Sequence, residues 1–120
     1  MKWLLETDTA HLPHTIQDHV DVRLRYALAR FGSRIERVTV FLRDLNGPKG
    51  GFDKVCRIMA KVRGCGEIVV GVIDTDWAIA VDRATTRIGH TVSRQLGRLR
   101  ETRRRVSPVR FARQLSGLSQ

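Results

Sequence analysis

Hydrophobic residues recur every three or four positions between residues 15 and 31, and this spacing predicts a helix with one buried face. The face consists of Ile16, Val20, Leu24, Ala27, Leu28 and Phe31. Thr15, with Asp18 three residues later, is expected to cap this helix. Gly32 stands where helices commonly place a terminating glycine.

A second, longer helix is expected to begin near Thr75 or Asp76, and its apolar pattern decays from Arg100 onward. Its apolar stripe consists of Trp77, Val81, Ala84, Ile88, Val92 and Leu99. Trp77 is expected to anchor the start of the helix in the core.

Between the two helices the pattern changes to strict alternation, which is typical of strands with one buried face. Residues 34–44, 54–63 and 67–75 are predicted to form three consecutive strands, and residues 2–7 form a short strand before the first helix. The expected inward residues of the first two consecutive strands are Val38, Val40, Leu42, Cys56, Ile58, Ala60 and Val62. Their outward positions carry several arginines and lysines, so the second face of the sheet is expected to be open and basic.

The resulting order, β-α-β-β-β-α, predicts an α+β fold with two helices packed on one face of a four-stranded, mainly antiparallel sheet. Double-stranded RNA-binding domains share this two-layer plan, although a shared plan does not establish function. Residues 1–105 are expected to form a single domain. Residues 106–120, which lack a sustained apolar face, are expected to form a basic and mobile C-terminal tail.

The charge balance of the chain indicates which class of partner it binds. The 120 residues include 22 Lys and Arg against 12 Asp and Glu, a net charge of +10. Such an excess favours a polyanion, with nucleic acid ahead of an anionic membrane surface. No apolar run approaches the ~20 residues of a membrane span, and neither a signal peptide nor a disulfide framework is evident. We therefore expect a cytoplasmic protein with reduced thiols and no membrane partner.

The second helix carries a row of arginines, Arg83, Arg87, Arg94 and Arg98, spaced by four, seven and four residues. At ~100° per residue the four lie within an arc of roughly 60°, about 120° from the centre of the apolar stripe. His90 falls on the same arc. Such a row is either a solvated face or a track for phosphates, and the near absence of acidic residues along it favours phosphates.

Four further cations are secondary candidates for RNA contact: Arg23, Arg30, Lys49 and Lys54. The two arginines lie on one flank of the first helix. The two lysines lie in or just after the loop NGPKGG, which is not a Walker loop because no Gly-Lys-Ser/Thr follows. A flexible hairpin connection is the favoured interpretation of this loop, and a phosphate cradle is the alternative.

No pattern predicts an enzyme. The histidines at positions 11, 14, 19 and 90 lack matching ligands at zinc spacing. Cys56 is expected to be buried and Cys65 to be an exposed thiol in a turn, and neither has the partners of a catalytic nucleophile. We expect no catalytic residue, metal, cofactor or small-molecule substrate. Gly89 and Gly97, inside the second helix, either admit RNA backbone or are weak points of the helix.

The segment RIERVTVFLRDLNGPKGGFDKVCRIMAKV, followed by WAIAVDRATTRIGHTVSRQLGRL, resembles short ribosome hibernation-promoting factors, once called sigma-54 modulation proteins. The resemblance covers roughly residues 1–100. It implies that basic residues of the second helix lie against small-subunit ribosomal RNA, in the channel for messenger and transfer RNA. Arg87, Arg94 and Arg98 match the family's basic positions, and His90 falls where another basic residue is frequent. Arg83 matches no family position, and the first helix does not align cleanly with the lysines of better-known members.

The prediction is a non-enzymatic, stress-response translation inhibitor that binds rRNA of the small ribosomal subunit and blocks translation sterically. The alternative is a basic protein-interaction module that regulates an acidic protein partner. The oligomeric state is left open, with a monomer expected on the ribosome. Long family members add a C-terminal domain that pairs two ribosomes, and because 120 residues are too few to include it, ribosome dimerisation by that route is not expected.

Overall fold

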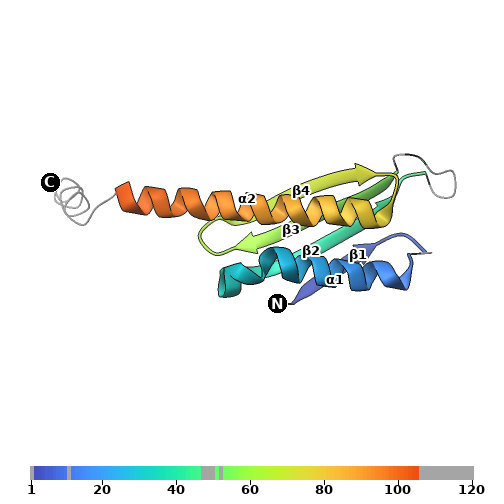
Figure 1. Ribbon diagram of the computed structural model, residues 1–120, viewed down its shortest axis with the longest axis horizontal. Coiled ribbons are helices and arrows are strands. Elements are labelled where there is room, and N and C mark those ends of the chain that lie inside the picture. Colours follow the sequence, from blue (N-terminus) through green and yellow to red (C-terminus); the bar gives the residue numbers. More distant parts are fainter. Residues whose placement is uncertain (1, 11, 47–50, 52, 106–120) are drawn as a thin grey trace.

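The computed structural model describes residues 2–105, except 11, 47–50 and 52. Its elements follow the predicted order (Figure 1). They are β1 (Trp3–Thr7), α1 (His14–Leu28), a 3₁₀ segment η1 (Ala29–Arg34), β2 (Ile35–Asp44), β3 (Lys54–Val62), β4 (Gly66–Asp74) and α2 (Trp77–Arg105). The predicted tail, residues 106–120, and Lys49 lie outside the described residues.

The strands form one four-stranded sheet in the order β1-β2-β3-β4. β1 pairs with β2 in parallel, since the crossover through α1 brings the chain back in the same direction. The β2–β3 and β3–β4 pairs are antiparallel, with Leu42 opposite Cys56 and Cys56 opposite Val72. This mixed, mainly antiparallel sheet confirms the predicted α+β fold.

Both helices cover the same face of the sheet and lie side by side (Figure 1). The core is formed by the predicted apolar faces of the two helices and by the inward residues of β2, β3 and β4. Cys56 and the other predicted inward residues of β2 and β3 are at most 1% exposed. The strand registers read from alternation are therefore correct.

The prediction for the start of α1 is wrong. Pro13, with extended dihedral angles of φ −61° and ψ 140°, occupies the N-cap position, and no side chain of a described residue caps the helix. Thr15 is an exposed residue inside the helix. Proline fixes φ at about −65°, and the Pro13 carbonyl oxygen accepts a hydrogen bond from the Ile16 N–H at 3.0 Å, so the chain enters the helix there without a hydroxyl cap.

At the other end, α1 stops at Leu28 and the chain continues as η1, where Gly32 takes a positive φ of 56°. The predicted start of α2 is confirmed, because Asp76 Oδ1 accepts hydrogen bonds from the N–H groups of Ala78 and Ile79 at 2.8 and 3.2 Å. The helix runs beyond Arg100 to Arg105. Its last turns are rich in arginine, a good helix former that needs no apolar stripe.

The second sheet face departs from the expectation of an open basic surface. Leu4, Val69 and Ile73 are 61, 45 and 42% exposed on it, interspersed with the basic side chains. Thr39 is only 4% exposed because β2 is a central strand, on which it is flanked by Leu4 and Met59. This face is therefore a mixed apolar and basic surface.

Candidate nucleic-acid interface

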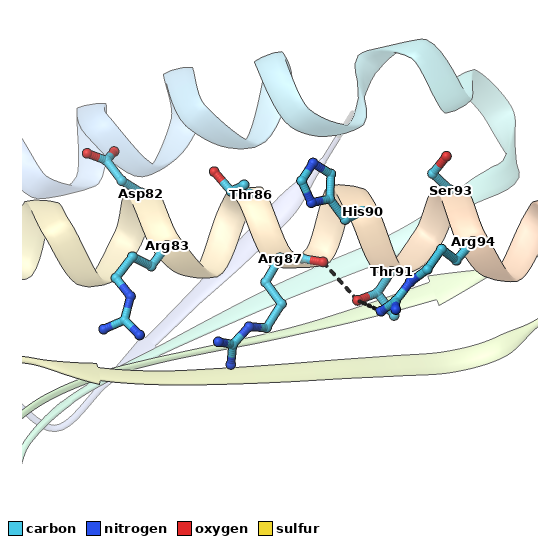
Figure 2. Close-up of a pocket in the computed structure, with 8 residues that line it drawn as sticks. All are labelled: Asp82, Arg83, Thr86, Arg87, His90, Thr91, Ser93 and Arg94. Atoms are coloured by element: carbon cyan, nitrogen blue, oxygen red, sulfur yellow. Dashed lines mark hydrogen bonds between the residues drawn. The ribbon is translucent and has the colours of Figure 1, made fainter.

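The exposed side of α2 presents two rows of side chains around a shallow groove of about 730 Å³. Figure 2 shows Arg83 and Arg87 pointing toward β4, whereas Asp82, Thr86 and His90 point toward α1. The helix repeat creates these rows, since positions three and four residues apart share a face. His90 thus lies at the border between the arginine row and the space between the helices.

Two arginines of the row also contact the edge strand. Arg83 Nη1 lies 2.9 Å from Asp74 Oδ2 and 3.3 Å from the carbonyl oxygen of Ile73, and Arg87 Nη1 donates to the carbonyl oxygen of Gly71 at 2.9 Å. Among the described strands, β4 has only β3 as a neighbour, so these carbonyls would otherwise depend on water. The first part of the row therefore fixes α2 against the sheet.

The Arg83 guanidinium has an electrostatic consequence for Asp74. Its hydrogen bond, followed by hydrogen bonds from Thr75, lowers the pKa of the Asp74 carboxyl below its ordinary value. The Arg83 side chain nevertheless stays 49% exposed. Asp74 therefore partly neutralises the Arg83 charge, but the guanidinium remains accessible to solvent.

Arg94 and Arg98 lie further along the row and are both exposed. Neither forms an ion pair with another residue of the described part of the chain. Arg94 Nη2 lies 3.5 Å from the Thr91 hydroxyl, which leaves most of its guanidinium donors to solvent. These two arginines are the cations of the row that are most available to phosphate.

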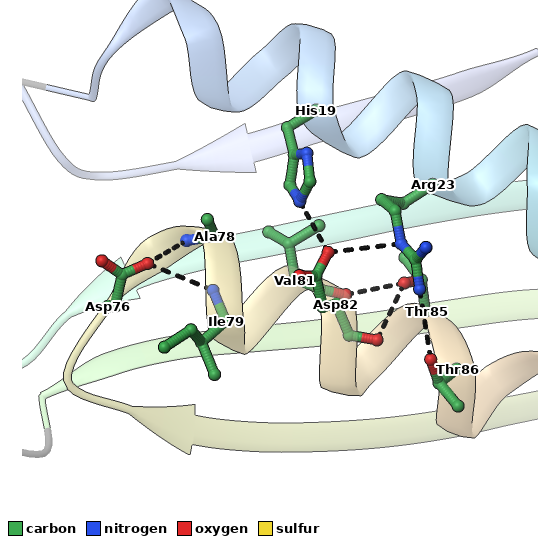
Figure 3. A network of polar contacts seen from close by, with 9 residues as sticks. All are labelled: His19, Arg23, Asp76, Ala78, Ile79, Val81, Asp82, Thr85 and Thr86. Atoms are coloured by element: carbon green, nitrogen blue, oxygen red, sulfur yellow. Dashed lines mark hydrogen bonds and ion pairs between the residues drawn. The ribbon is translucent and has the colours of Figure 1, made fainter.

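Between the helices, Asp82 joins α2 to α1 (Figure 3). Its Oδ1 lies 2.6 Å from His19 Nε2 and 3.2 Å from Arg23 Nε, the latter at ion-pair distance but without hydrogen-bond geometry. Arg23 Nη2 also donates to the Thr86 hydroxyl at 3.4 Å. Arg23 therefore has a fixed position at the helix–helix contact, with its side chain 32% exposed.

Arg30 is exposed about two turns beyond Arg23, with its guanidinium carbon 4.8 Å from the centroid of the Phe31 ring. Together with Phe31, Ser93 and Arg100 it lines a second groove of about 320 Å³ between the helices. The structure thus places both candidates, Arg23 in α1 and Arg30 in η1, beside α2.

Lys54 has a different environment from the other candidates. Its Nζ lies 2.8 Å from Asp44 Oδ2 and 3.3 Å from Asp53 Oδ2, and its side chain is only 16% exposed. The hydrogen bond to Asp44 raises its pKa, against an opposing effect of desolvation. The ammonium also lies 5.6 Å from the centroid of the Trp77 ring. This geometry gives Lys54 a structural role, and we leave it out of the proposed RNA contacts.

Gly89 has a role that the sequence left open. A Cβ at this position would lie 3.3 Å from the carbonyl oxygen of Ala27 and 3.4 Å from its Cβ. Gly89 therefore permits close approach of α1, whereas a Cβ on Gly97 would meet nothing within 4 Å.

Two residues of the grooves between the helices were missed by sequence reasoning. Tyr26 is 81% exposed and lines a groove with Arg23, Arg30 and His90, and Arg100 lines the neighbouring groove. A signal for Tyr26 was present, because it lies three residues after Arg23, four before Arg30 and outside the apolar face. Arg100 was obscured by the charge cluster in which it lies.

Among the described residues, the thiols and the possible metal ligands offer no alternative site. Cys56 is fully buried, and desolvation raises its pKa to about 12. Cys65 is half-buried and packs against the core, so the prediction of an exposed thiol is wrong. The turn folds back on α2, where a Cβ on Gly64 would lie 2.9 Å from Leu99. Within the described ranges, no group of three or more His, Cys, Asp or Glu residues could hold a metal ion.

No helix in the described part of the chain is long and apolar enough to span a membrane.

The fold matches two solved structures of ribosome-related proteins. The N-terminal domain of Thermus thermophilus Protein Y aligns with a TM-score of 0.60 at 25% identity, over 77% of this chain and 93% of that chain. A ribosomal subunit interface protein from Coxiella burnetii aligns with a TM-score of 0.68 at 12% identity, over 81% and 99% of the two chains. No family model and no curated protein sequence matches the chain.

These matches show that the chain has the same fold as these two proteins. Both proteins are members of the ribosome hibernation-promoting factor family. The structural neighbours confirm the resemblance to this family that the sequence indicated.

Proposed function

We propose that this protein is a non-enzymatic, cytoplasmic translation inhibitor that associates with the ribosome. It binds rRNA of the small subunit in the channel for messenger and transfer RNA, and blocks translation by occupying that space. The observation that carries the proposal is the exposed arginine row of α2, on a fold shared with a ribosomal subunit interface protein.

The row is suited to RNA backbone. Arg98 lies 15 positions after Arg83, which is ~22 Å along the helix axis at 1.5 Å per residue. Guanidinium groups bind phosphate oxygens through paired donors, and such contacts fix position without reading base sequence. Arg94 and Arg98 are the principal contacts, Arg83 and Arg87 contribute their unengaged donors, and Arg23, Arg30 and His90 extend the surface toward α1.

The proposed inhibition of translation is steric and requires no catalysed reaction. The net charge of +10 accelerates the approach to rRNA, and the rigid two-layer fold then fills the space needed by other RNAs. Ribosome binding and translation inhibition should therefore be lost together when the row is reversed in sign.

The test is co-sedimentation of an Arg94→Glu, Arg98→Glu variant with purified small subunits at several salt concentrations. The matched control is Arg37→Glu with Arg43→Glu, which changes the net charge equally at two exposed positions of β2. We expect the α2 variant to lose binding at physiological salt and the β2 variant to retain most of it. Circular dichroism provides the folding control.

Normal co-sedimentation of the α2 variant would show that the row is a solvated face. Equal loss in both variants would show that only the total charge matters. Wild-type protein that leaves ribosomal subunits in solution and captures an acidic protein would favour the alternative of a protein-interaction module.

A further inference from the structure

Among the described residues, Tyr26 is the most exposed large hydrophobic side chain, and it lines the groove between α1 and α2. Its relative exposure is 81%, and it is the only tyrosine in the chain. An aromatic ring in this position contributes nothing to the core, and the other large side chains that line its groove, Arg23, Arg30 and His90, are basic. Its environment on α1 points to a ligand with an aromatic face.

The ring has two cationic neighbours in its groove. The guanidinium carbon of Arg23 lies 5.7 Å from the ring centroid, and Arg30, in η1, lines the same groove. Arg23 is itself held by Asp82 and by the Thr86 hydroxyl, so its position beside the ring is fixed from α2 (Figure 3). The ring therefore lies in a preorganised positive environment.

The groove beside the ring has a volume of about 260 Å³ and is floored by the close contact of Ala27 with Gly89. This volume lies just below the ~300 Å³ at which pockets for drug-sized ligands begin. A single planar ring suits the space better than an entire cofactor. His90 and Thr86 supply polar groups at its α2 wall.

We propose that Tyr26 stacks against one unpaired nucleobase of the bound RNA, with the flanking arginines on the adjacent phosphates. The inference rests on the proposed RNA-binding function and deepens it, because it adds one base contact to a surface otherwise directed at the backbone. Stacking on an aromatic side chain tolerates any base, since every base has a π-face. The site therefore selects unpaired over paired RNA, and it does not select a sequence.

The first measurement uses the uniqueness of the tyrosine. Incorporation of 3-fluorotyrosine labels position 26 alone, and the probe is an eight-nucleotide oligouridylate compared with the same backbone lacking bases. We expect the ¹⁹F resonance to shift upfield with the base-bearing oligonucleotide, through the ring current of the stacked base. The abasic oligonucleotide should leave it nearly unchanged at equal occupancy.

The second measurement uses variants on purified small subunits. Tyr26→Phe keeps the ring and should bind as the wild type does, whereas Tyr26→Leu should weaken binding about tenfold. The salt dependence should stay the same in both, since no charge is removed. Leu4→Ala, which removes an exposed hydrophobic side chain from the opposite sheet face, is the matched control and should bind normally.

Wild-type affinity in Tyr26→Leu, or an equal ¹⁹F shift with the abasic backbone, would overturn the stacking site. Either result would leave the proposed function standing as long as the wild type binds small subunits. If the wild type does not bind them, the proposed function fails, and the oligonucleotide measurement still decides whether Tyr26 stacks on bases.

Discussion

Gly89 on α2 lies against Ala27 on α1, so closely that a Cβ on the glycine would be 3.3 Å from the alanine carbonyl oxygen. The contact joins two small residues from helices that are far apart in sequence. It brings the Arg23–Tyr26 side of α1 next to the Thr86–His90 side of α2. The surface proposed to bind RNA therefore depends on a helix–helix distance that a side chain at position 89 would increase.

The two helical glycines should respond differently to substitution. Gly97→Ala adds a methyl group in open space and should stabilise the protein by about 0.5–1 kcal/mol, because alanine loses less backbone entropy. Gly89→Ala should increase the stability by less, because the new Cβ fits only if Ala27 shifts slightly away from it. Gly89→Val overpacks that contact and should destabilise by about 1–3 kcal/mol. Chemical denaturation of the three variants measures the differences, and equal stabilisation by both alanines would contradict the close contact.

Loss of the Arg83 partner should change the acid stability through Asp74. The native-state pKa of Asp74 is lowered, so its ion pair stabilises the fold above the ordinary carboxyl pKa and is lost as pH falls through the lowered value. In Arg83→Gln the Asp74 pKa should rise, and the acid unfolding midpoint should move to higher pH. NMR titration of the carboxyl and circular dichroism against pH measure the two effects. If the Asp74 pKa is unchanged in Arg83→Gln, the Arg83 guanidinium is not the main cause of the lowered pKa.

Lys54→Met should destabilise the fold. It should leave the salt dependence of ribosome binding unchanged, because Lys54 is not a proposed phosphate contact. Two carboxylates would lose their shared ammonium, and Asp53 is fully buried. We expect the melting temperature to fall by more than about 5 °C. In the wild type the raised Lys54 pKa means that this stabilisation is complete below the ordinary lysine pKa and is lost as pH rises through the native value. The matched variant Lys61→Met removes a 52% exposed lysine and should be nearly neutral. A stable Lys54→Met protein with weakened ribosome binding would return Lys54 to the RNA contacts.

The two cysteines should differ in reactivity. Cys56 combines full burial with a pKa raised to about 12, so its thiolate is both scarce and inaccessible at neutral pH. Cys65, half-buried in the β3–β4 turn, should react first with a maleimide, but more slowly than in denaturant. Mass spectrometry of Cys56→Ser and Cys65→Ser variants identifies the labelled position. Fast labelling of both native thiols would mean that the β3 register is displaced by one residue.

Single substitutions in the row should separate phosphate contacts from structural ones. Arg94→Ala and Arg98→Ala each remove one proposed phosphate partner, and each should reduce the slope of log K against log salt by up to about 0.7–0.9, a range taken from simpler nucleic acids. Arg87→Ala should lower stability slightly as well, because the Gly71 carbonyl loses its donor. Binding isotherms on small subunits at four salt concentrations provide the slopes. Unchanged slopes in Arg94→Ala and Arg98→Ala would exclude these residues from the phosphate track.

Periodicity was sufficient to predict most of the fold. Alternation in residues 34–44 and 54–63 is set by the two-residue period of a strand, which shows directly which side chains are inward, Val40 and Cys56 among them. The helical repeats likewise located both apolar stripes, because burial of one helix face follows from local geometry and solvent alone. Local rules failed at Thr15, where the backbone conformation of Pro13 determined the start of the helix.

The helical repeat also placed the arginines in one row, but it could not assign their partners. Arg83 and Arg87 contact the edge of β4, Lys54 is enclosed by Asp44 and Asp53, and Arg94 and Arg98 stay exposed. The spacing of these cations along the sequence does not distinguish them, because their partners come from other helices and strands. Only the packing of α2 on β4 and of α1 on α2 decides which positive charges are neutralised within the protein and which remain for a ligand.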